Sequence, residues 1–241
     1  MAASRHGDTI LPDGRTIARA AFLLDLDGTL IEIAATPDAV IVPPALPRLL
    51  RRLRARHADA VAIISGRPVE VVDALLGDAP YAVAGEHGAA IRLAPDRPVA
   101  RDALPVLAAD TLARATAVVA GFPGALVERK AHGVALHYRQ APQAEAALHD
   151  AAAAIVAACP GFALLRGSMV WEVRPAGVHK GHAVRALMAA PPFAGRVPLF
   201  IGDDVTDEDA IAAAAALGGV GLLVGTAFAS PAAVRRWLED A

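Results

Sequence analysis

The sequence predicts an α/β protein in which a parallel-sheet core is interrupted by a smaller α+β insert. Apolar runs typical of buried strands alternate with helical patterns before residue 100 and again after residue 176. Between these stretches a helix–strand–strand unit occurs twice, which indicates an antiparallel sheet. We therefore expect a leader, a core in two parts and an inserted domain, with boundaries at 1–20, 21–100, 101–176 and 177–241.

The first part of the core is expected to begin with the strand Ala21–Leu26. The helix that follows has leucines at 46, 49, 50 and 53, a spacing that places them on one face. Pro68 is suited to the first turn of a helix, and Gly77 to its end. The expected elements, in order, are strand Ala21–Leu26, helix Ala45–Arg56, strand Ala60–Ile64, helix 68–77, and strands Tyr81–Ala84 and Ala89–Arg92.

The insert and the second part of the core follow the same logic of periodicity. In the insert we expect helices at about 104–120 and 142–158, and strands Ala125–Lys130, Gly133–His137, Ala163–Arg166 and Val170–Arg174. In the core we expect a helix from Lys180, strand Val197–Ile201, helix Asp207–Leu217, strand Val220–Val224 and a terminal helix. A cleft between core and insert is the expected ligand site.

The composition excludes several classes of function. A net charge of -2 gives no general attraction to nucleic acid or to anionic membranes, and 4% aromatic residues leave little for base stacking. The apolar stretch 151–158 is too short to span a bilayer, and residues 1–20 lack the apolar region of a signal peptide. A single cysteine, Cys159, suits a reducing compartment. We expect a cytoplasmic monomer that acts on a small molecule.

Four short clusters fall at predicted strand ends or helix starts. They are "DLDGT" at 25–29, "SGR" at 65–67, Lys180 in "VHKGH", and "GDDVTDED" at 202–209. Acids that meet at one edge of a sheet repel one another unless a hard cation lies among them, and Mg²⁺ prefers such oxygen ligands. A metal, a lysine and a hydroxyl together form a cradle for a phosphoryl group.

Each cluster also has a purely structural interpretation. "DLDG" suits a turn or part of a calcium loop, although the glutamate of an EF-hand is missing at its twelfth position. Ser65 can cap a helix, Lys180 can be a solvated helix residue, and the acids at 203–209 can stabilise a helix N-terminus. One shared site explains four coincidences in a fixed order better than four separate accidents do.

Taken together, the clusters resemble the haloacid dehalogenase-like phosphatases, and the resemblance covers about 21–226. It implies a Rossmann-like core with a C2-type cap. It also implies that Asp25 is the nucleophile and Asp27 the general acid and base, while Ser65 and Lys180 bind phosphoryl oxygens. Gly28, Thr29, Gly66 and Arg67 would surround the phosphate. Mg²⁺ would be held by Asp25, by the backbone carbonyl of Asp27, and by Asp203 with Asp204 and Asp207.

The strings "VERKAHGVALHYRQAP", "MVWEVRPAGVHKG" and "GEHG" are similar to those of the trehalose-6-phosphate phosphatases. This resemblance implies that Glu128, Lys130 and Glu172 bind glucose hydroxyls, with His87, His132, His137 and Arg139 as further contacts. On pattern alone, Glu128 and Lys130 could equally line a solvent-exposed face. A related phosphatase of sucrose phosphate or mannosyl-glycerate phosphate, a non-catalytic phosphate-binding module and a phosphotransferase remain the alternatives.

Overall fold

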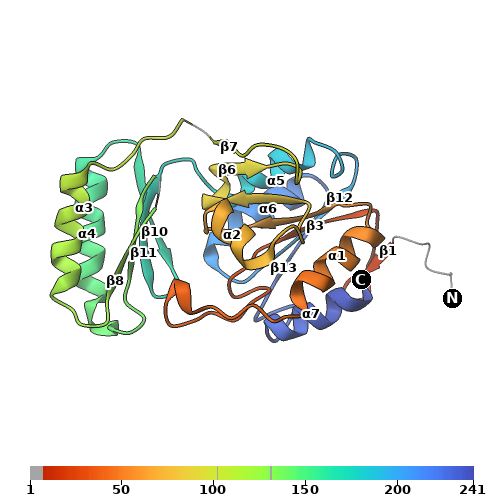
Figure 1. Cartoon of the computed structure of the whole chain (residues 1–241), viewed down its shortest axis with the longest axis horizontal. Helices are drawn as coiled ribbons and strands as arrows, with labels where there is room; N and C mark the ends of the chain where they lie inside the picture. The colour runs from red at the N-terminus through yellow and green to blue at the C-terminus, as the bar shows by residue number, and fades with distance from the viewer. Residues whose placement is uncertain (1–7, 102, 131) are drawn as a thin grey trace. The chain divides into compact units, whose positions relative to one another are not determined.

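The computed structural model describes residues 8–101, 103–130 and 132–241, and the chain divides into two compact units (Figure 1). The first unit takes the chain up to Arg101 and from His179 onward, and the second is the contiguous stretch Asp102–Val178. The insert expected at 101–176 overlaps the second unit. Its assignment as a separate domain stays a prediction.

A seven-stranded sheet forms the centre of the first unit, in the order β13–β12–β3–β4–β5–β6–β7. Neighbouring strands from β13 to β5 are parallel, whereas β6 and β7 join as an antiparallel edge. The nucleophile candidate thus follows a central strand, β3. The strands are β3 (Ala20–Leu24), β4 (Val61–Ile64), β5 (Ala82–Gly85), β6 (Ala90–Arg92), β7 (Ala100–Arg101), β12 (Val197–Gly202) and β13 (Val220–Leu223).

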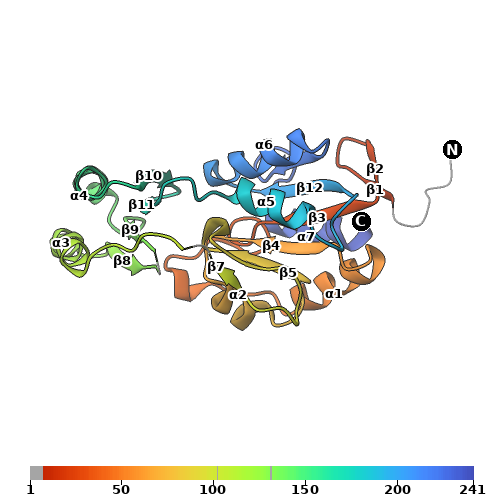
Figure 2. The same cartoon turned by 90° about the horizontal axis from the view of Figure 1, so that it is seen from above.

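Helices cover both faces of this sheet because successive strand side chains point to opposite sides (Figure 2). Phe22 and Leu24 pack in one buried cluster with α1 (Leu46–Arg56), α2 (Val69–Leu76) and α7 (Pro231–Asp240). Ala21 and Leu23 pack in the other with α5 (Lys180–Met188) and α6 (Glu208–Ala216). A strand that is apolar on both faces is typical of a parallel sheet.

The N-terminal segment differs from the flexible leader expected for 1–20. Strands β1 (Asp8–Ile10) and β2 (Thr16–Ala18) form an antiparallel hairpin, and Leu11 and Ile17 join the core. The Trp237 indole donates to the Ile10 carbonyl at 3.1 Å. The expectation is therefore wrong for this hairpin, because two buried apolar side chains and one hydrogen bond from α7 hold it against the core. Residues 1–7 lie outside the described part of the chain.

The second unit is an antiparallel sheet with two helices packed on one face (Figure 1). Its strand order is β10–β11–β9–β8, with all neighbours antiparallel. The first helix begins at 109 rather than 104, after an irregular stretch. The elements are α3 (Ala109–Ala120), β8 (Leu126–Arg129), β9 (Val134–His137), α4 (Glu145–Ala158), β10 (Phe162–Gly167) and β11 (Val170–Pro175).

The parallel-rich sheet of the first unit confirms the predicted α/β class. Among the described residues, none of the helices combines the length and the apolar composition that a membrane crossing requires. Short 3₁₀ turns complete the chain, and one of them, Val205–Asp207, carries part of the acid cluster.

Candidate active site

The site lies at the carboxyl edge of the first unit's parallel sheet. Asp25 directly follows β3, Ser65 follows β4 and Asp203 follows β12, while Lys180 is the first residue of α5. Because β12, β3 and β4 are adjacent and parallel, their ends meet at one edge. The Asp25 amide donates to the Ile201 carbonyl at 2.9 Å, which fixes the nucleophile candidate against the neighbouring strand.

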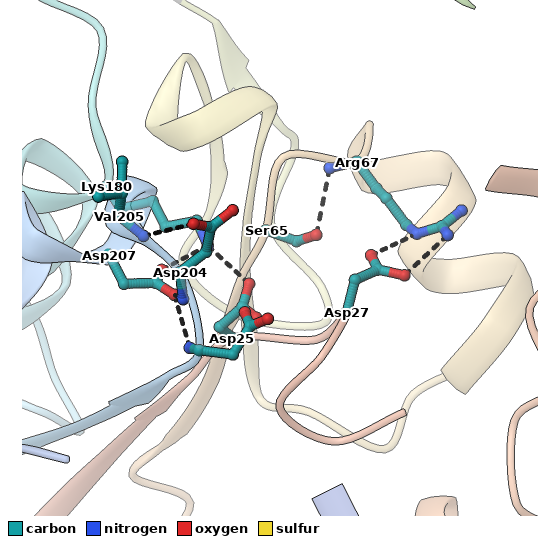
Figure 3. Close-up of polar contacts among 9 residues, drawn as sticks. Asp25, Asp27, Ser65, Arg67, Lys180, Asp204, Val205 and Asp207 are labelled. Atoms are coloured by element: carbon teal, nitrogen blue, oxygen red, sulfur yellow. Dashed lines mark hydrogen bonds and ion pairs between the residues drawn. The ribbon is translucent and has the colours of Figure 1, made fainter. Parts of the chain in front are cut away.

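Lys180 links two of the carboxylates (Figure 3). Its Nζ lies 2.6 Å from Asp25 Oδ1 and 2.6 Å from Asp207 Oδ1, and all three side chains are almost fully buried. Burial acts to lower the pKa of Lys180, but the Asp25 and Asp207 carboxylates outweigh it and raise that pKa above its ordinary value. The lysine is therefore a fixed positive charge beside the nucleophile candidate.

Three carboxylates converge here. Asp25, Asp203 and Asp207 each offer an oxygen atom, and these atoms lie within 4.8 Å of one another. Burial, opposed by the Lys180 charge, raises the pKa of Asp25 well above its ordinary value. Burial and the Asp207 carboxylate raise the pKa of Asp203 to about 7. One ammonium does not neutralise three acids, so the cluster favours an additional cation.

One atom of this cluster supports that conclusion directly. Asp25 Oδ2 is buried and has no hydrogen-bond partner among the described residues. A buried carboxylate oxygen without a partner is costly, and a divalent ion with oxygen ligands would satisfy it. The donor set is made of carboxylates without thiol or imidazole, which fits Mg²⁺ better than a transition metal.

The acid cluster divides into different roles. Asp207 Oδ2 accepts from the Asp203 and Asp204 amides at 2.9 and 3.2 Å, so it holds the loop after β12. Asp204 Oδ1 instead accepts from the Val205 amide at 2.6 Å and caps the 3₁₀ turn. The structure therefore does not place Asp204 in the metal cluster that we expected it to join. Its carboxylate is committed to the start of this turn.

The structure gives a second reason for a glycine at position 28, besides the expected close approach of the backbone to phosphate. Its φ of +80° is one that glycine adopts readily, and a Cβ there would lie 1.9 Å from Asp203 Oδ2. The glycine therefore leaves room for the second carboxylate of the cluster. Thr29, expected at the phosphate, is fully buried, and its hydroxyl has no hydrogen-bond partner among the described residues. This burial does not favour a substrate contact by its side chain.

Asp27 points away from this cluster (Figure 3). Its two oxygens accept from Arg67, with Nε–Oδ2 at 2.6 Å and Nη2–Oδ1 at 2.8 Å. The Arg67 amide donates to Ser65 Oγ at 3.1 Å, a hydrogen bond within the "SGR" turn that fixes the position of the serine hydroxyl. Arg67, expected at the substrate, thus holds the acid–base candidate in this structure.

The "GEHG" turn packs against the "SGR" turn. Its His87 is buried, and a Cβ on Gly66 would lie 2.7 Å from the imidazole ring. The Glu86 and His87 amides donate to the Arg67 and Ser65 carbonyls, each at 3.0 Å. His87, expected to contact substrate, therefore packs against the "SGR" turn, which explains why residue 66 is a glycine.

The second unit carries a separate polar group on its sheet. The Glu128 carboxylate lies 2.8 Å from His137 Nε2, and the Lys130 ammonium donates to Glu172 at 2.7 Å. Glu128 and Glu172 both pair in register with Ala135, from the two neighbouring strands, so they share one face. Arg139, by contrast, donates to the Ser168 carbonyl at 2.9 Å and is half-buried.

Charge pairing sets the ionisation of this polar group. Burial alone would raise the pKa of Glu128, but the His137 hydrogen bond and the Lys130 charge lower it below its ordinary value. Burial would likewise lower the pKa of Lys130, but Glu172 and Glu128 raise it. The face thus presents charged groups, which make short and directional hydrogen bonds.

Sequence reasoning did not find two features of the site. One is the pairing of Arg67 with Asp27, which are 40 positions apart. The other is the contact of Arg67 with the Pro37 carbonyl at 3.0 Å. Neither has a local signal, since each depends on how two loops meet.

Comparison with known proteins then decides the family. The family model described as trehalose-phosphatase matches residues 23–227. The trehalose-6-phosphate phosphatase of Escherichia coli (strain K12) is 41% identical over 209 residues, covering 87% of this chain and 79% of that protein. This chain belongs to the trehalose-phosphatase family.

Two further relatives show the same relation. A probable trehalose-phosphate phosphatase of Sinorhizobium fredii is 42% identical over 206 residues, covering 85% of this chain and 77% of that protein. The solved C-terminal domain of the Candida albicans trehalose-6-phosphate phosphatase has a TM-score of 0.80 at 24% identity, with 92% of this chain and 91% of that chain covered. The expected haloacid dehalogenase-like fold is confirmed. Membership of the trehalose-phosphatase family identifies the chain as a phosphatase.

Proposed function

We propose that this chain hydrolyses trehalose 6-phosphate to trehalose and phosphate, as the last step of trehalose biosynthesis. The observation that carries the proposal is the buried Asp25 carboxylate, bound by Lys180 at 2.6 Å and beside Asp203, in a chain of the trehalose-phosphatase family. The substrate is a small molecule.

Asp25 acts as the nucleophile. Its oxygen attacks phosphorus, the bond between phosphorus and the sugar oxygen breaks, and an aspartyl phosphate forms. The Lys180 ammonium favours the ionised form of Asp25 and can bind a phosphoryl oxygen as charge moves from the carboxylate to the phosphate. Ser65 Oγ, at the end of the neighbouring strand, supplies a hydroxyl for a second phosphoryl oxygen.

Asp27 manages the protons. It gives a proton to the sugar oxygen as the bond to phosphorus breaks, and then takes one from the water that attacks the aspartyl phosphate. That attack releases phosphate and restores the Asp25 carboxylate. The two aspartates can do different work because their surroundings differ: Asp25 is buried beside Lys180, whereas Asp27 is paired with Arg67 and is about one-third exposed at 32%.

Mg²⁺ is the proposed cofactor, and the carboxylates of Asp25 and Asp203 and the Asp27 backbone carbonyl would hold it, with Asp207 in support. When bound, it would supply positive charge for the phosphoryl oxygens. The partnerless Asp25 Oδ2 and the elevated pKa of Asp203, about 7, are the observations that favour it. Asp207 serves mainly as a support because Lys180 and two backbone amides already occupy its oxygens.

The polar face of the second unit is the proposed sugar-binding surface. A neutral disaccharide needs many hydrogen bonds, and the charged side chains of Glu128, Lys130 and Glu172 make short, directional ones. Residues that bind the distal sugar can also lower the barrier at phosphorus, because remote binding energy positions the reacting bond.

The test is phosphate release from trehalose 6-phosphate, with Mg²⁺ and with EDTA. We expect fast release with Mg²⁺ and almost none after chelation, and clear preference over glucose 6-phosphate, sucrose phosphate and mannosyl-glycerate phosphate. Preference for one of these other esters would assign the chain to a sibling activity. Transfer of phosphate to an added sugar instead of water would identify a phosphotransferase.

The covalent step has its own test. Asp25→Asn should lower turnover by roughly four orders of magnitude or more, because an amide oxygen is a poor nucleophile. Phosphate bound covalently to Asp25 in the rapidly quenched wild type, seen by mass spectrometry, would support the same step. An Asp25→Asn enzyme with a tenth of the activity would indicate direct attack by water. Cytoplasmic location and a monomeric state stay predictions.

A further inference from the structure

The ion pair between Arg67 and Asp27 is more than a neighbouring contact. It is bidentate, with both carboxylate oxygens accepting from one guanidinium at 2.6 and 2.8 Å. The Arg67 side chain is 13% exposed and that of Asp27 is 32% exposed. A forked pair of this kind fixes the plane and the direction of the carboxylate, which a single hydrogen bond cannot do.

Arg67 is in turn anchored from several sides. Its Nη2 donates to the Pro37 carbonyl at 3.0 Å, which ties it to the segment between β3 and α1. Its amide donates to Ser65 Oγ at 3.1 Å, and its carbonyl accepts from the Glu86 amide at 3.0 Å. The guanidinium is therefore held by the protein before any ligand binds.

A carboxylate bound in this way keeps free lone pairs. Asp27 has about four lone-pair positions on its two oxygens, and the Arg67 fork uses two of them. The remaining positions can carry the proton that a departing sugar oxygen needs. General acid catalysis requires that this proton lie within hydrogen-bond reach, and a displacement of about 1 Å can cost about 10²-fold in rate.

We infer that Arg67 is a positioning residue for the acid–base carboxylate Asp27. It joins Asp27 to the turn that carries Ser65, so that the proton donor and a phosphate-binding hydroxyl move as one unit. The inference rests on the proposed role of Asp27 as general acid. It assigns Arg67 to the leaving-group side of the reaction rather than to binding of the phosphate.

The dependence of the rate on the leaving group distinguishes a positioning role of Arg67 from a role in stability alone. A sugar alkoxide needs a proton as it departs, whereas 4-nitrophenolate leaves without one. Loss of the general acid's position should therefore slow the first substrate much more than the second. The measured quantity is kcat/KM, because it covers the steps up to formation of the aspartyl phosphate and excludes its later hydrolysis.

The chain offers a closely matched control in the same unit. Arg92 and Asp73 also form a bidentate pair, at 2.5 and 2.7 Å, with side-chain exposures of 13% and 34%. Neither residue belongs to the site. Arg92→Met thus removes a bidentate ion pair of similar length and burial, although it uses Nη1 and Nη2 instead of Nε and Nη2, and it measures how much of any effect is loss of stability.

The experiment compares Arg67→Met, Arg67→Lys and Arg92→Met on trehalose 6-phosphate, 4-nitrophenyl phosphate and a series of aryl phosphates. For Arg67→Met we expect kcat/KM for trehalose 6-phosphate to fall about 10- to 100-fold, and for 4-nitrophenyl phosphate less than about threefold. The dependence of log kcat/KM on leaving-group pKa should become steeper. Arg67→Lys should recover little, since an ammonium lacks the fork.

Two more results would decide the inference. Added guanidinium should restore part of the sugar phosphate activity of Arg67→Met and leave Arg92→Met unchanged. Equal losses on all substrates, together with weaker inhibition by inorganic phosphate, would overturn the inference and show that Arg67 binds the phosphate. An unchanged leaving-group dependence would also overturn it.

The aryl series separates this inference from the proposed function. If the wild type hydrolyses aryl phosphates but not trehalose 6-phosphate, the substrate assignment fails, while the slope of the aryl series still tests Arg67. If trehalose 6-phosphate is the substrate and the slope does not change in Arg67→Met, the inference alone fails.

Discussion

The Lys180 ammonium lies 2.6 Å from Asp25 Oδ1, and both side chains are only 4% exposed. The same ammonium contacts Asp207 Oδ1 at 2.6 Å. A cation buried between two acids supports both the reaction and the fold. Its removal should therefore affect two separate measurements.

Lys180→Met should lower activity and stability together. The variant leaves buried carboxylates without a counter-charge, which costs about 3–5 kcal/mol in the free energy of unfolding. Chemical denaturation in EDTA would measure this loss. The double variant Lys180→Met/Asp25→Asn should regain part of that stability but no activity. A single variant as stable as the wild type would contradict the view that this ammonium compensates the acid cluster.

Gly28→Ala should weaken metal binding. The new Cβ would lie 1.9 Å from Asp203 Oδ2, so this carboxylate must move. We expect the Mg²⁺ concentration for half-maximal activity to rise about tenfold or more, equivalent to about 1.4 kcal/mol of lost binding free energy. The thermal shift produced by Mg²⁺ should shrink in parallel, because a bound ion stabilises only the folded state.

Gly14→Ala is the matched control for this change. Gly14 has a φ of +84°, close to the +80° of Gly28, but no atom lies within 4 Å of the position that a Cβ would take there. It should show the backbone strain, of about 1–2 kcal/mol, without any change in Mg²⁺ dependence. Equal Mg²⁺ requirements in both variants would mean that Asp203 does not hold the ion.

Glu128→Ala should harm the sugar substrate selectively. Glu128 lies on the polar face of the second unit with His137 at 2.8 Å, and 4-nitrophenyl phosphate has no sugar to bind there. We expect kcat/KM for trehalose 6-phosphate to fall about 10²-fold, with little change for the aryl ester. Glu145→Ala is the control, since Glu145 pairs with Arg166 at 2.7 Å at the start of α4. Equal losses on both substrates would make Glu128 structural.

His57 should make stability depend on pH. It is 3% exposed, its ring packs 4.6 Å from that of Phe22, and burial lowers its pKa below the ordinary value. Below about pH 6.5 the unfolded chain binds a proton that the folded chain resists, so the stability contribution falls as pH falls. When the pH is lowered from about 7.5 to about 5.5, the free energy of unfolding should therefore fall less in His57→Leu than in the wild type, as measured by urea midpoints. Parallel losses in both proteins would refute this.

The fold was largely predictable because its signals are local. Strand β3 has five buried residues in succession, and α1 has its leucines on one face, so each element is visible within a dozen residues. The N-terminal hairpin was missed because its order depends on Trp237, which lies 227 positions away from Ile10. No local pattern in the first twenty residues reports such a contact.

The site was predictable in its members but not in its pairings. Asp25, Asp203, Asp207 and Lys180 meet because strand ends share an edge, which topology alone dictates. Asp204 and Asp207 are three positions apart and have the same side chain. The conformation of the turn determines that Asp204 caps the 3₁₀ turn, whereas Asp207 accepts from the backbone amides of the loop after β12. Arg67 was assigned to the phosphate because it follows Ser65 closely in the sequence. The direction of its side chain depends instead on its contacts with Asp27 and the Pro37 carbonyl.

The place of β3 in the sheet has a consequence for biosynthesis. This strand lies between β4, which the ribosome makes soon afterwards, and β12, which it makes only after the stretch Asp102–Val178. Because β12 pairs with β3 directly, the nascent chain must keep a fully apolar strand covered until this partner is made. The contiguous stretch Asp102–Val178 can meanwhile bury its own residues. Truncation before β12 should therefore yield an insoluble product rather than a weak enzyme, because it leaves the fully apolar strand β3 as an uncovered sheet edge.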